Sequence, residues 1–235
     1  MASWPVETLD PEEGKVSYLL RVVVPDQPGT LGAVATALGQ TGADIVSVDI
    51  VERTRGQAVD DLVVDLPYGR MPDVLVTAAT SVPGVLVESI RPYGGGPLDT
   101  SRELEVIEAM AERPADAIIE LATALPRIFR AGWAVVVYRL DDGYVLRAAS
   151  AAAPEMAEVR LPWLPVAKAV VLEPEDDWVP TSWQNLGTEL VAAPLGVPER
   201  AVLLGRPGGP AFRSGEVMRL AHLTGIAATV LAAAR

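Results

Sequence analysis

The stretch Val24-Pro25-Asp26-Gln27-Pro28-Gly29-Thr30-Leu31 decides how the N-terminal part of this chain folds. In front of it, residues 16–24 are apolar at every second position, which is the period of a strand with one buried face. Behind it, apolar residues recur over positions 31–38 at the i, i+3, i+4 and i+7 spacing of an amphipathic helix. Pro28 suits the first turn of this helix, because its φ is already helical and it needs no backbone partner there. The stretch therefore predicts a strand, a tight loop and a helix N-terminus.

This loop has the chemistry of an anion-binding site. Gly29 has no Cβ, so another molecule can approach the backbone closely. The N–H groups around Thr30 to Gly32 have no partner within the helix, and together with the helix dipole they favour an anion such as a carboxylate. Asp26 has two interpretations that stay open: it caps the helix through its side chain, or it takes part in ligand binding. The loop predicts a small-molecule recognition site.

The same patterns continue beyond the loop. They predict strands at 43–53 and 57–66, a short helix that begins at 71, and a last strand at 85–91. The resulting order is strand, helix, strand, strand, helix, strand. This is the order of the ferredoxin-like split βαβ fold.

Residues 16–92 resemble an ACT domain, an amino-acid-sensing regulatory module. Three motifs carry the resemblance: D-x-P-G-x-L at residues 26–31, Gly42-Ala43-Asp44-Ile45-Val46-Ser47, and Ser81-Val82-Pro83-Gly84-Val85. The resemblance implies a ferredoxin-like βαββαβ fold that pairs side by side with a second copy. It also implies a ligand held between the first loop of one copy and the second strand of its partner.

The resemblance implies a specific set of ligand-binding residues. They are Asp26, Gln27, Gly29, Thr30, Leu31, Asp44, Ile45 and Val46. The backbone of Gly29 to Leu31 would hold a carboxylate, and Asp26 or Asp44 could hold an ammonium group. Serine-sensing members of the family have asparagine at the positions of these two aspartates and histidine at Val24, so serine specificity does not transfer. Two carboxylates in place of two amides favour a cationic amino acid such as arginine.

A second domain is expected after a glycine-rich break. Gly94-Gly95-Gly96-Pro97 predicts a linker, which divides the chain into a tail (1–15), an ACT-like domain (16–92), a linker (93–100) and a second domain (101–235). The second domain has predicted helices, a hairpin at 133–150, strands at 189–194 and 201–205, and a closing helix that ends at 234. The expected class of the whole chain is α+β.

The second domain resembles a GAF domain, a sensory module in which an antiparallel sheet is flanked by helices. The matching residues are Leu190-Val191-Ala192-Ala193-Pro194-Leu195, Ala201-Val202-Leu203-Leu204-Gly205-Arg206, Phe212, Glu216, Leu220 and Leu223. The cysteine that attaches bilins in some members is missing, and no ligand is carried over. Trp163, Trp178 and Trp183 either line an apolar pocket or fill the core. The closing helix has two apolar sides, which suggests packing on its own sheet and on a partner chain.

Composition and charge exclude several classes of protein. The net charge is −12, from 19 basic and 31 acidic residues, which disfavours nucleic-acid binding. There is no cysteine, so disulfides and thiolate chemistry are excluded. No apolar run approaches the roughly 20 residues that cross a bilayer, and residues 1–14 do not form a signal peptide. We expect a cytoplasmic protein that does not bind membranes.

No catalytic group is evident in the sequence. His222 is the only histidine, so no histidine cluster can bind a metal. The glycine-rich run at 205–210 lacks the Lys-Ser/Thr of a phosphate-binding loop. The acidic pairs Asp60-Asp61 and Asp176-Asp177, and also Asp49 and Asp65, are expected in solvent.

We therefore expect a homodimeric, non-catalytic, amino-acid-sensing regulatory protein without a cofactor or a metal. In this interpretation the ligand binds at the interface of two ACT-like domains, and the GAF-like domain relays the signal. Two alternatives stay open. One is a ligand-free scaffold for an unknown protein partner, and the other is an enzyme that uses carboxylates in a GAF-like pocket.

Overall fold

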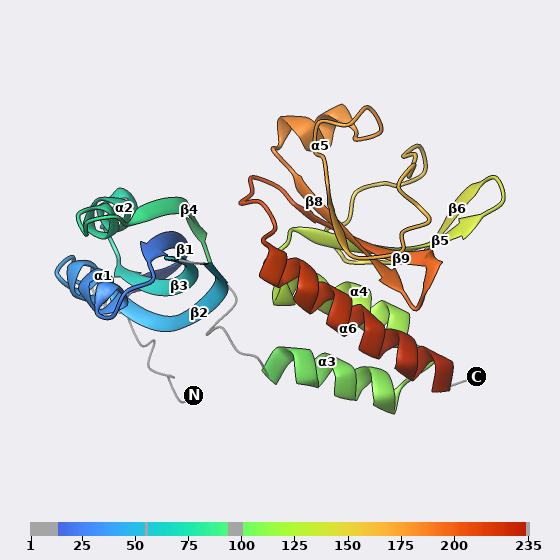
Figure 1. Ribbon diagram of the computed structural model, residues 1–235, viewed down its shortest axis with the longest axis horizontal. Helices are drawn as coiled ribbons and strands as arrows, with labels where there is room; N and C mark the ends of the chain where they lie inside the picture. The colour runs from blue at the N-terminus through green and yellow to red at the C-terminus, as the bar shows by residue number, and fades with distance from the viewer. Residues whose placement is uncertain (1–13, 55, 94–100, 234–235) are drawn as a thin grey trace, which may run out of the picture. The chain divides into compact units, whose positions relative to one another are not determined.

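The computed structural model describes residues 14–54, 56–93 and 101–233, and the chain divides into two compact units, residues 1–98 and 99–235 (Figure 1). The predicted tail lies outside the described residues except for Gly14 and Lys15, and the predicted linker lies outside them except for Tyr93. The predicted residue limits of the domains stay a prediction.

The first unit contains the elements that the sequence pattern predicts, in the same order. They are β1 (Lys15–Pro25), α1 (Thr30–Gly39), β2 (Asp44–Thr54), β3 (Gln57–Pro67), α2 (Asp73–Thr80) and β4 (Leu86–Pro92). The strands pair antiparallel in the order β2-β3-β1-β4. This topology confirms the ferredoxin-like βαββαβ prediction. Pro28 lies before the helix rather than in its first turn, because Gly29 is the N-cap residue.

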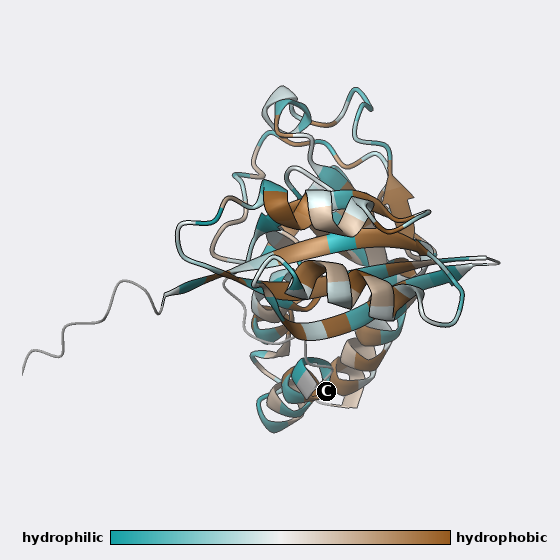
Figure 2. Cartoon of the chain, turned by 90° about the vertical axis from the view of Figure 1, so that its left-hand side faces the viewer, coloured by the Kyte–Doolittle hydropathy of each residue, from teal (hydrophilic) through white to brown (hydrophobic). Residues whose placement is uncertain are grey.

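The two helices of the first unit cover one face of its sheet (Figure 1). β1 and β3 pair without a register shift, so their side chains alternate strictly between the two faces. The helix-facing side chains of these strands form the core together with α1 and α2. They are Leu20, Val22, Val24, Ala58, Leu62, Val64 and Leu66. Figure 2 shows hydrophobic residues along the strands, interrupted by short hydrophilic stretches.

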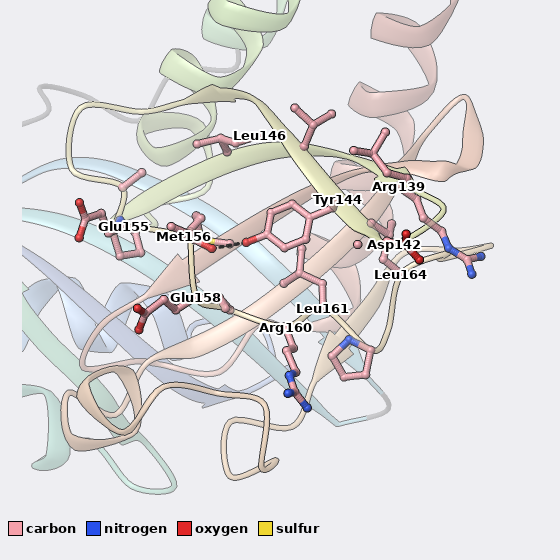
Figure 3. Close-up of a pocket in the computed structure, with 18 of the residues that line it drawn as sticks. Arg139, Asp142, Tyr144, Leu146, Glu155, Met156, Glu158, Arg160, Leu161 and Leu164 are labelled. Atoms are coloured by element: carbon pink, nitrogen blue, oxygen red, sulfur yellow. Dashed lines mark hydrogen bonds between the residues drawn. The ribbon is translucent and has the colours of Figure 1, made fainter.

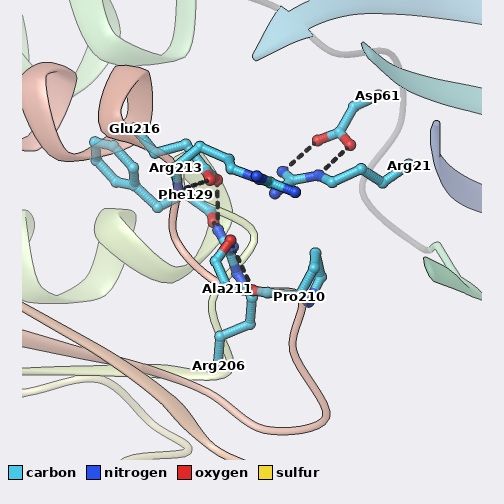
Figure 4. A network of polar contacts seen from close by, with 8 residues as sticks. All are labelled: Arg21, Asp61, Phe129, Arg206, Pro210, Ala211, Arg213 and Glu216. Atoms are coloured by element: carbon cyan, nitrogen blue, oxygen red, sulfur yellow. Dashed lines mark hydrogen bonds and ion pairs between the residues drawn. The ribbon is translucent and has the colours of Figure 1, made fainter. Parts of the chain in front are cut away.

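Two adjacent aspartates of β3 are buried, so the prediction that they lie in solvent is wrong. Asp61 lies directly opposite Arg21 of β1, whose Nε and Nη2 donate to the two carboxylate oxygens at 2.7 and 2.8 Å (Figure 4). Asp60 is 3% exposed and lies on the opposite, helix-covered face. Asp49 and Asp65 are half-buried rather than solvated. Successive residues of a strand point to opposite faces of the sheet, which explains why Asp60 and Asp61 have different surroundings. The prediction considered the two residues together as an acidic pair and did not take this alternation into account.

The second unit is an antiparallel sheet flanked by helices, as predicted. Its elements are α3 (Ser101–Glu112), α4 (Ala117–Ile128), β5 (Trp133–Leu140), β6 (Gly143–Ala149), β7 (Val170–Leu172), α5 (Thr181–Asn185), β8 (Glu189–Leu195), β9 (Val197–Arg206) and α6 (Ser214–Ala233). The sheet order is β6-β5-β9-β8-β7. α3, α4 and α6 lie on one side of this sheet (Figure 1), and the loop-rich segment 150–188 packs on the other.

The tryptophans of the second unit fill the core on the loop-covered side of the sheet. Trp183 is buried and packs on Trp133, with 4.8 Å between ring centroids. Trp163 and Trp178 pair at 6.2 Å and pack partly buried against the same cluster. The structure therefore supports the core interpretation of these residues.

A buried ion pair joins α6 to β9. Arg206 and Glu216 are 0% and 3% exposed at their side chains, and Arg206 Nη2 donates to Glu216 Oε1 at 2.6 Å (Figure 4). The same guanidinium donates to the carbonyl oxygens of Phe129 and Pro210 at 2.6 and 2.9 Å. Its Cζ lies 3.9 Å from the centroid of the Phe212 ring. This network fixes the start of α6 on the sheet.

α6 is long and apolar enough to cross a membrane by length and composition, the one such helix in the described ranges. Leu220, Leu223 and Ala227 are buried in the core that α6 forms with the sheet. This burial is typical of the core helix of a folded domain. The second apolar side that the sequence predicts consists of Leu223, Ile226 and Val230; of these, Ile226 is exposed, whereas Leu223 is buried and Val230 packs partly buried against the same core.

Candidate functional site

The loop between β1 and α1 leaves the N-terminus of the helix open. Gly29 has φ +92°, a left-handed conformation that side chains with a Cβ rarely adopt, and no side chain caps the helix. The amides of Thr30 and Ala33 donate to the carbonyls of Gln27 and Gly29 at 3.2 and 2.9 Å. In the described part of the chain, the backbone amides of residues 31 and 32 donate no hydrogen bond. This turn of backbone therefore offers two N–H donors to an anion.

Asp26 does not cap the helix, so that interpretation is wrong. Its carboxylate lies 3.3 Å from Arg53 Nη2 at the end of β2. Its amide donates to the carbonyl of Gly56 in the turn between β2 and β3 at 3.0 Å. Asp26 thus attaches the loop to the β2–β3 turn, and its negative charge already has a cation within the chain.

Asp44 lies at the other end of the sheet from the loop. Asp44 pairs with Asp65, whereas Thr54 at the far end of β2 pairs with Gln57 beside the loop. The 11 residues of β2 separate its ends by roughly 33 Å. Asp44 is exposed and lies 3.7 Å from Lys15 Nζ. Asp26 and Asp44 therefore do not meet in one copy of the chain.

The remaining predicted site residues divide between the same two places. Gln27 and Leu31 are exposed and Thr30 is half-buried at the loop, whereas Ile45 packs partly buried against the core at the start of β2. Val46 is exposed on the same strand. One copy thus brings the loop residues together and leaves the β2 residues apart from them.

β2 is an edge strand and carries exposed apolar side chains. Val46, Val48 and Ile50 are 38%, 42% and 52% exposed. Among the described strands β2 pairs with β3 alone, and an edge strand with apolar side chains is a ready template for pairing with another strand. The edge is therefore a candidate interface.

Asp60 is a functional candidate that the sequence reasoning missed. It lies on the helix-facing side of β3, opposite Val22 and Ile50, and its Oδ1 accepts no hydrogen bond from the described residues. Burial raises the pKa of Asp60, Arg53 lowers it, and the nearby aspartates raise it further. The sequence carries a signal for this burial, because position 60 has the same strand parity as the core residues of β3.

The second unit has an open groove of about 1140 Å³ between the β5–β6 hairpin and residues 153–164 (Figure 3). Its apolar lining includes the buried side chains of Met156, Leu161 and Leu164. Tyr144 Oη donates to the carbonyl of Met156 and ties the hairpin to the segment. The lining residues include none of the three tryptophans proposed for a pocket.

The charged residues of this groove are exposed and spread along it. Glu155 and Glu158 lie at one end and Asp142 at the other (Figure 3). Within the described part of the chain, no group of three or more His, Asp or Glu residues is placed to hold a metal ion.

The chain is similar to solved GAF and ACT domains. A GAF domain of a phosphoenolpyruvate-protein phosphotransferase from Coxiella burnetii is 15% identical over 57% of this chain and 95% of that one, with a TM-score of 0.42. The corresponding Acinetobacter domain is 13% identical over 58% and 96%, with a TM-score of 0.43. The ACT domain of a GTP pyrophosphokinase from Chlorobium tepidum is 16% identical over 34% and 100%, with a TM-score of 0.26.

No curated protein matches the chain. The family model of the ACT domain matches residues 18–86. This match spans the segment from β1 to the beginning of β4, with the loop and the β2 edge inside it. It confirms the ACT resemblance of the first unit.

Proposed function

We propose that this chain is a non-catalytic regulatory protein whose first unit binds a free amino acid. The observation that carries the proposal is the open N-terminus of α1, with its left-handed Gly29 and two N–H groups that have no partner among the described residues. Such a site suits the α-carboxylate of an amino acid. The ACT match at residues 18–86 supports a regulatory role, and the second unit would relay the bound state.

A homodimer through β2 would complete the site. When two β2 edges pair antiparallel around a two-fold axis, residue 44 of one copy lies beside residue 54 of the other. The end of β2 at residue 54 is the end that carries the ligand loop, since Asp26 contacts Arg53 there. Pairing in this way would place Asp44, Ile45 and Val46 of one copy next to the loop of the second copy.

Oxidation of an Asp49→Cys variant is expected to give a disulfide-linked dimer, because position 49 is the midpoint of β2 and would lie opposite its own counterpart at the two-fold axis. The chain has no other cysteine, so the product runs cleanly on a non-reducing gel. Leu86→Cys is the matched control, because Leu86 is exposed on β4, the opposite edge strand. Equal cross-linking of both variants would contradict the β2 interface.

Thermal unfolding of the purified protein with each of the twenty amino acids tests ligand binding. A ligand that binds the folded state stabilises it by about 2.7 kcal/mol at a hundredfold excess over Kd. We expect one amino acid, or a few related ones, to raise the midpoint of unfolding. A flat panel would favour the alternative, a scaffold that binds a protein partner.

Asp44→Ala is expected to weaken amino-acid binding and to leave the unfolding midpoint of the ligand-free protein unchanged. Asp44 is exposed and its contact with Lys15 is a surface ion pair, which contributes about 0–1 kcal/mol to stability. Calorimetric titration with the amino acid that the panel selects measures the affinity. Unchanged affinity would remove Asp44 from the site.

A further inference from the structure

We infer that Asp60 binds the positively charged side chain of the ligand, so that the site selects a cationic amino acid. This inference rests on the proposed function, because it assigns the ligand class of the same site. As the group that selects the charge of the ligand side chain, Asp60 takes the place of Asp26 and Asp44, the two carboxylates that the sequence pointed to; Asp44 remains a candidate for the α-ammonium group.

Asp60 lies on the face of the sheet that α1 and α2 cover. α1 packs against the β2 side of the sheet and α2 against β4, and β3 lies next to β2. The first residues of β3 lie at the end of the sheet where β1 leads into the ligand loop. Asp60 lies three positions from Gln57 at that end of the sheet, and Asp26 of the loop is among the charges that act on its carboxyl group.

The burial of the Asp60 carboxyl group, without a hydrogen-bond donor to Oδ1, suggests that a ligand cation binds there. The residue is 3% exposed, and Oδ1 has no hydrogen-bond partner in the part of the chain that the structure describes. A buried carboxylate oxygen without a hydrogen-bond donor is unfavourable, and the same burial raises the pKa of Asp60 even though Arg53 acts on it in the opposite direction. By contrast, Asp26 lies beside Arg53, and Asp61 is held by Arg21 in two hydrogen bonds.

In this proposal a ligand cation reaches Asp60 from the side of Arg53 and takes the place of that side chain. Arg53 is the cation that acts on the Asp60 carboxyl, and its own side chain is 61% exposed and paired with Asp26. Arg53 can therefore move aside into solvent. Positions 57 and 60 of β3 are about 10 Å apart, so the ligand needs a long side chain, as lysine and arginine have.

Two pairs of amino acids test this inference, because the members of each pair differ mainly in charge. They are L-arginine with L-citrulline, and L-lysine with L-norleucine. Calorimetry on the full-length protein is expected to show that at least one cationic member binds about 10 to 100 times more tightly than its neutral counterpart. Asp60→Asn is expected to remove this preference. Asp73→Asn is the matched control, because it makes the same change of charge on the exposed start of α2.

The outcomes separate the ligand class from the function itself. Equal affinity within each pair, or a preference that persists in Asp60→Asn, would overturn the role of Asp60. Binding of neutral amino acids alone would do the same and leave the proposed function in place. If none of the twenty amino acids binds, both proposals fail. The measurement on the wild-type protein stands even if Asp60→Asn does not fold.

Discussion

Glu216→Ala is expected to lower the free energy of unfolding of the second unit by about 3–5 kcal/mol. The substitution removes the carboxylate that the buried Arg206 guanidinium contacts at 2.6 Å, and that guanidinium is 0% exposed. It also removes the acceptor for the backbone amide of Arg213, which donates to Glu216 Oε2 at 2.9 Å. Urea denaturation followed by tryptophan fluorescence measures the loss, since Trp133, Trp163, Trp178 and Trp183 all lie in this unit.

The control is a partly exposed ion pair that joins α6 to α3. Arg219 of α6 pairs with Glu103 of α3, with side chains 34% and 29% exposed. Glu103→Ala is expected to cost about 0.2–1 kcal/mol, because solvent already screens this pair. Similar losses for the two variants would contradict the claim that burial decides the effect. The double change Arg206→Met with Glu216→Leu is expected to recover part of the stability, because neither charge of the pair is then left buried, while the backbone groups of Phe129, Pro210 and Arg213 lose their partners.

Gly205→Ala is the second substitution with a large expected effect, a destabilisation of about 1–3 kcal/mol from overpacking. A Cβ at this position would lie 2.1 Å from two ring atoms of Trp133. The Trp133 ring is buried and packs against Trp183, so it cannot move away freely. The same fluorescence-detected denaturation measures the change, and the signal itself reports on the displaced tryptophan.

Gly225→Ala is the control, because it is also a glycine-to-alanine change but is expected to raise the free energy of unfolding. Gly225 lies inside α6, and a Cβ added there would have nothing within 4 Å beyond its own stretch of helix. Alanine there is expected to stabilise the protein by about 0.4–1 kcal/mol, because it restricts the unfolded chain and favours the helix. If both substitutions destabilise to the same extent, the contact with Trp133 is not the cause.

The elements of the first unit could be predicted because the apolar residues of each element recur with the period of a strand or of a helix. β1 and α1 show clear two-residue and helical spacings on either side of the loop, and the ACT motifs fall on the same elements. β7 could not be predicted in this way. It is three residues long and exists through its pairing with β8, from Val170↔Ala192 to Leu172↔Leu190.

The site was harder to predict than the fold because its residues interact across the sheet. Helix capping was one of the two interpretations of Asp26, and only the antiparallel return of β2 brings Arg53 to it. Asp60 was considered as one of an adjacent acidic pair, although its strand parity assigns it to the core face. The separation of Asp26 from Asp44 follows from the length of β2, which a motif match does not reveal.

The loop between β1 and α1, which holds the candidate site, is attached to the β2–β3 turn, so ligand binding and dimer formation can affect each other. Asp26 touches the end of the strand whose free edge would form the dimer, through its contacts with Arg53 and Gly56. If two copies complete each site, ligand affinity and self-association strengthen each other by the same factor. A scarce protein and an abundant one would then respond to different concentrations of the same amino acid. The amount of protein made by the cell would thereby set the threshold of the sensor.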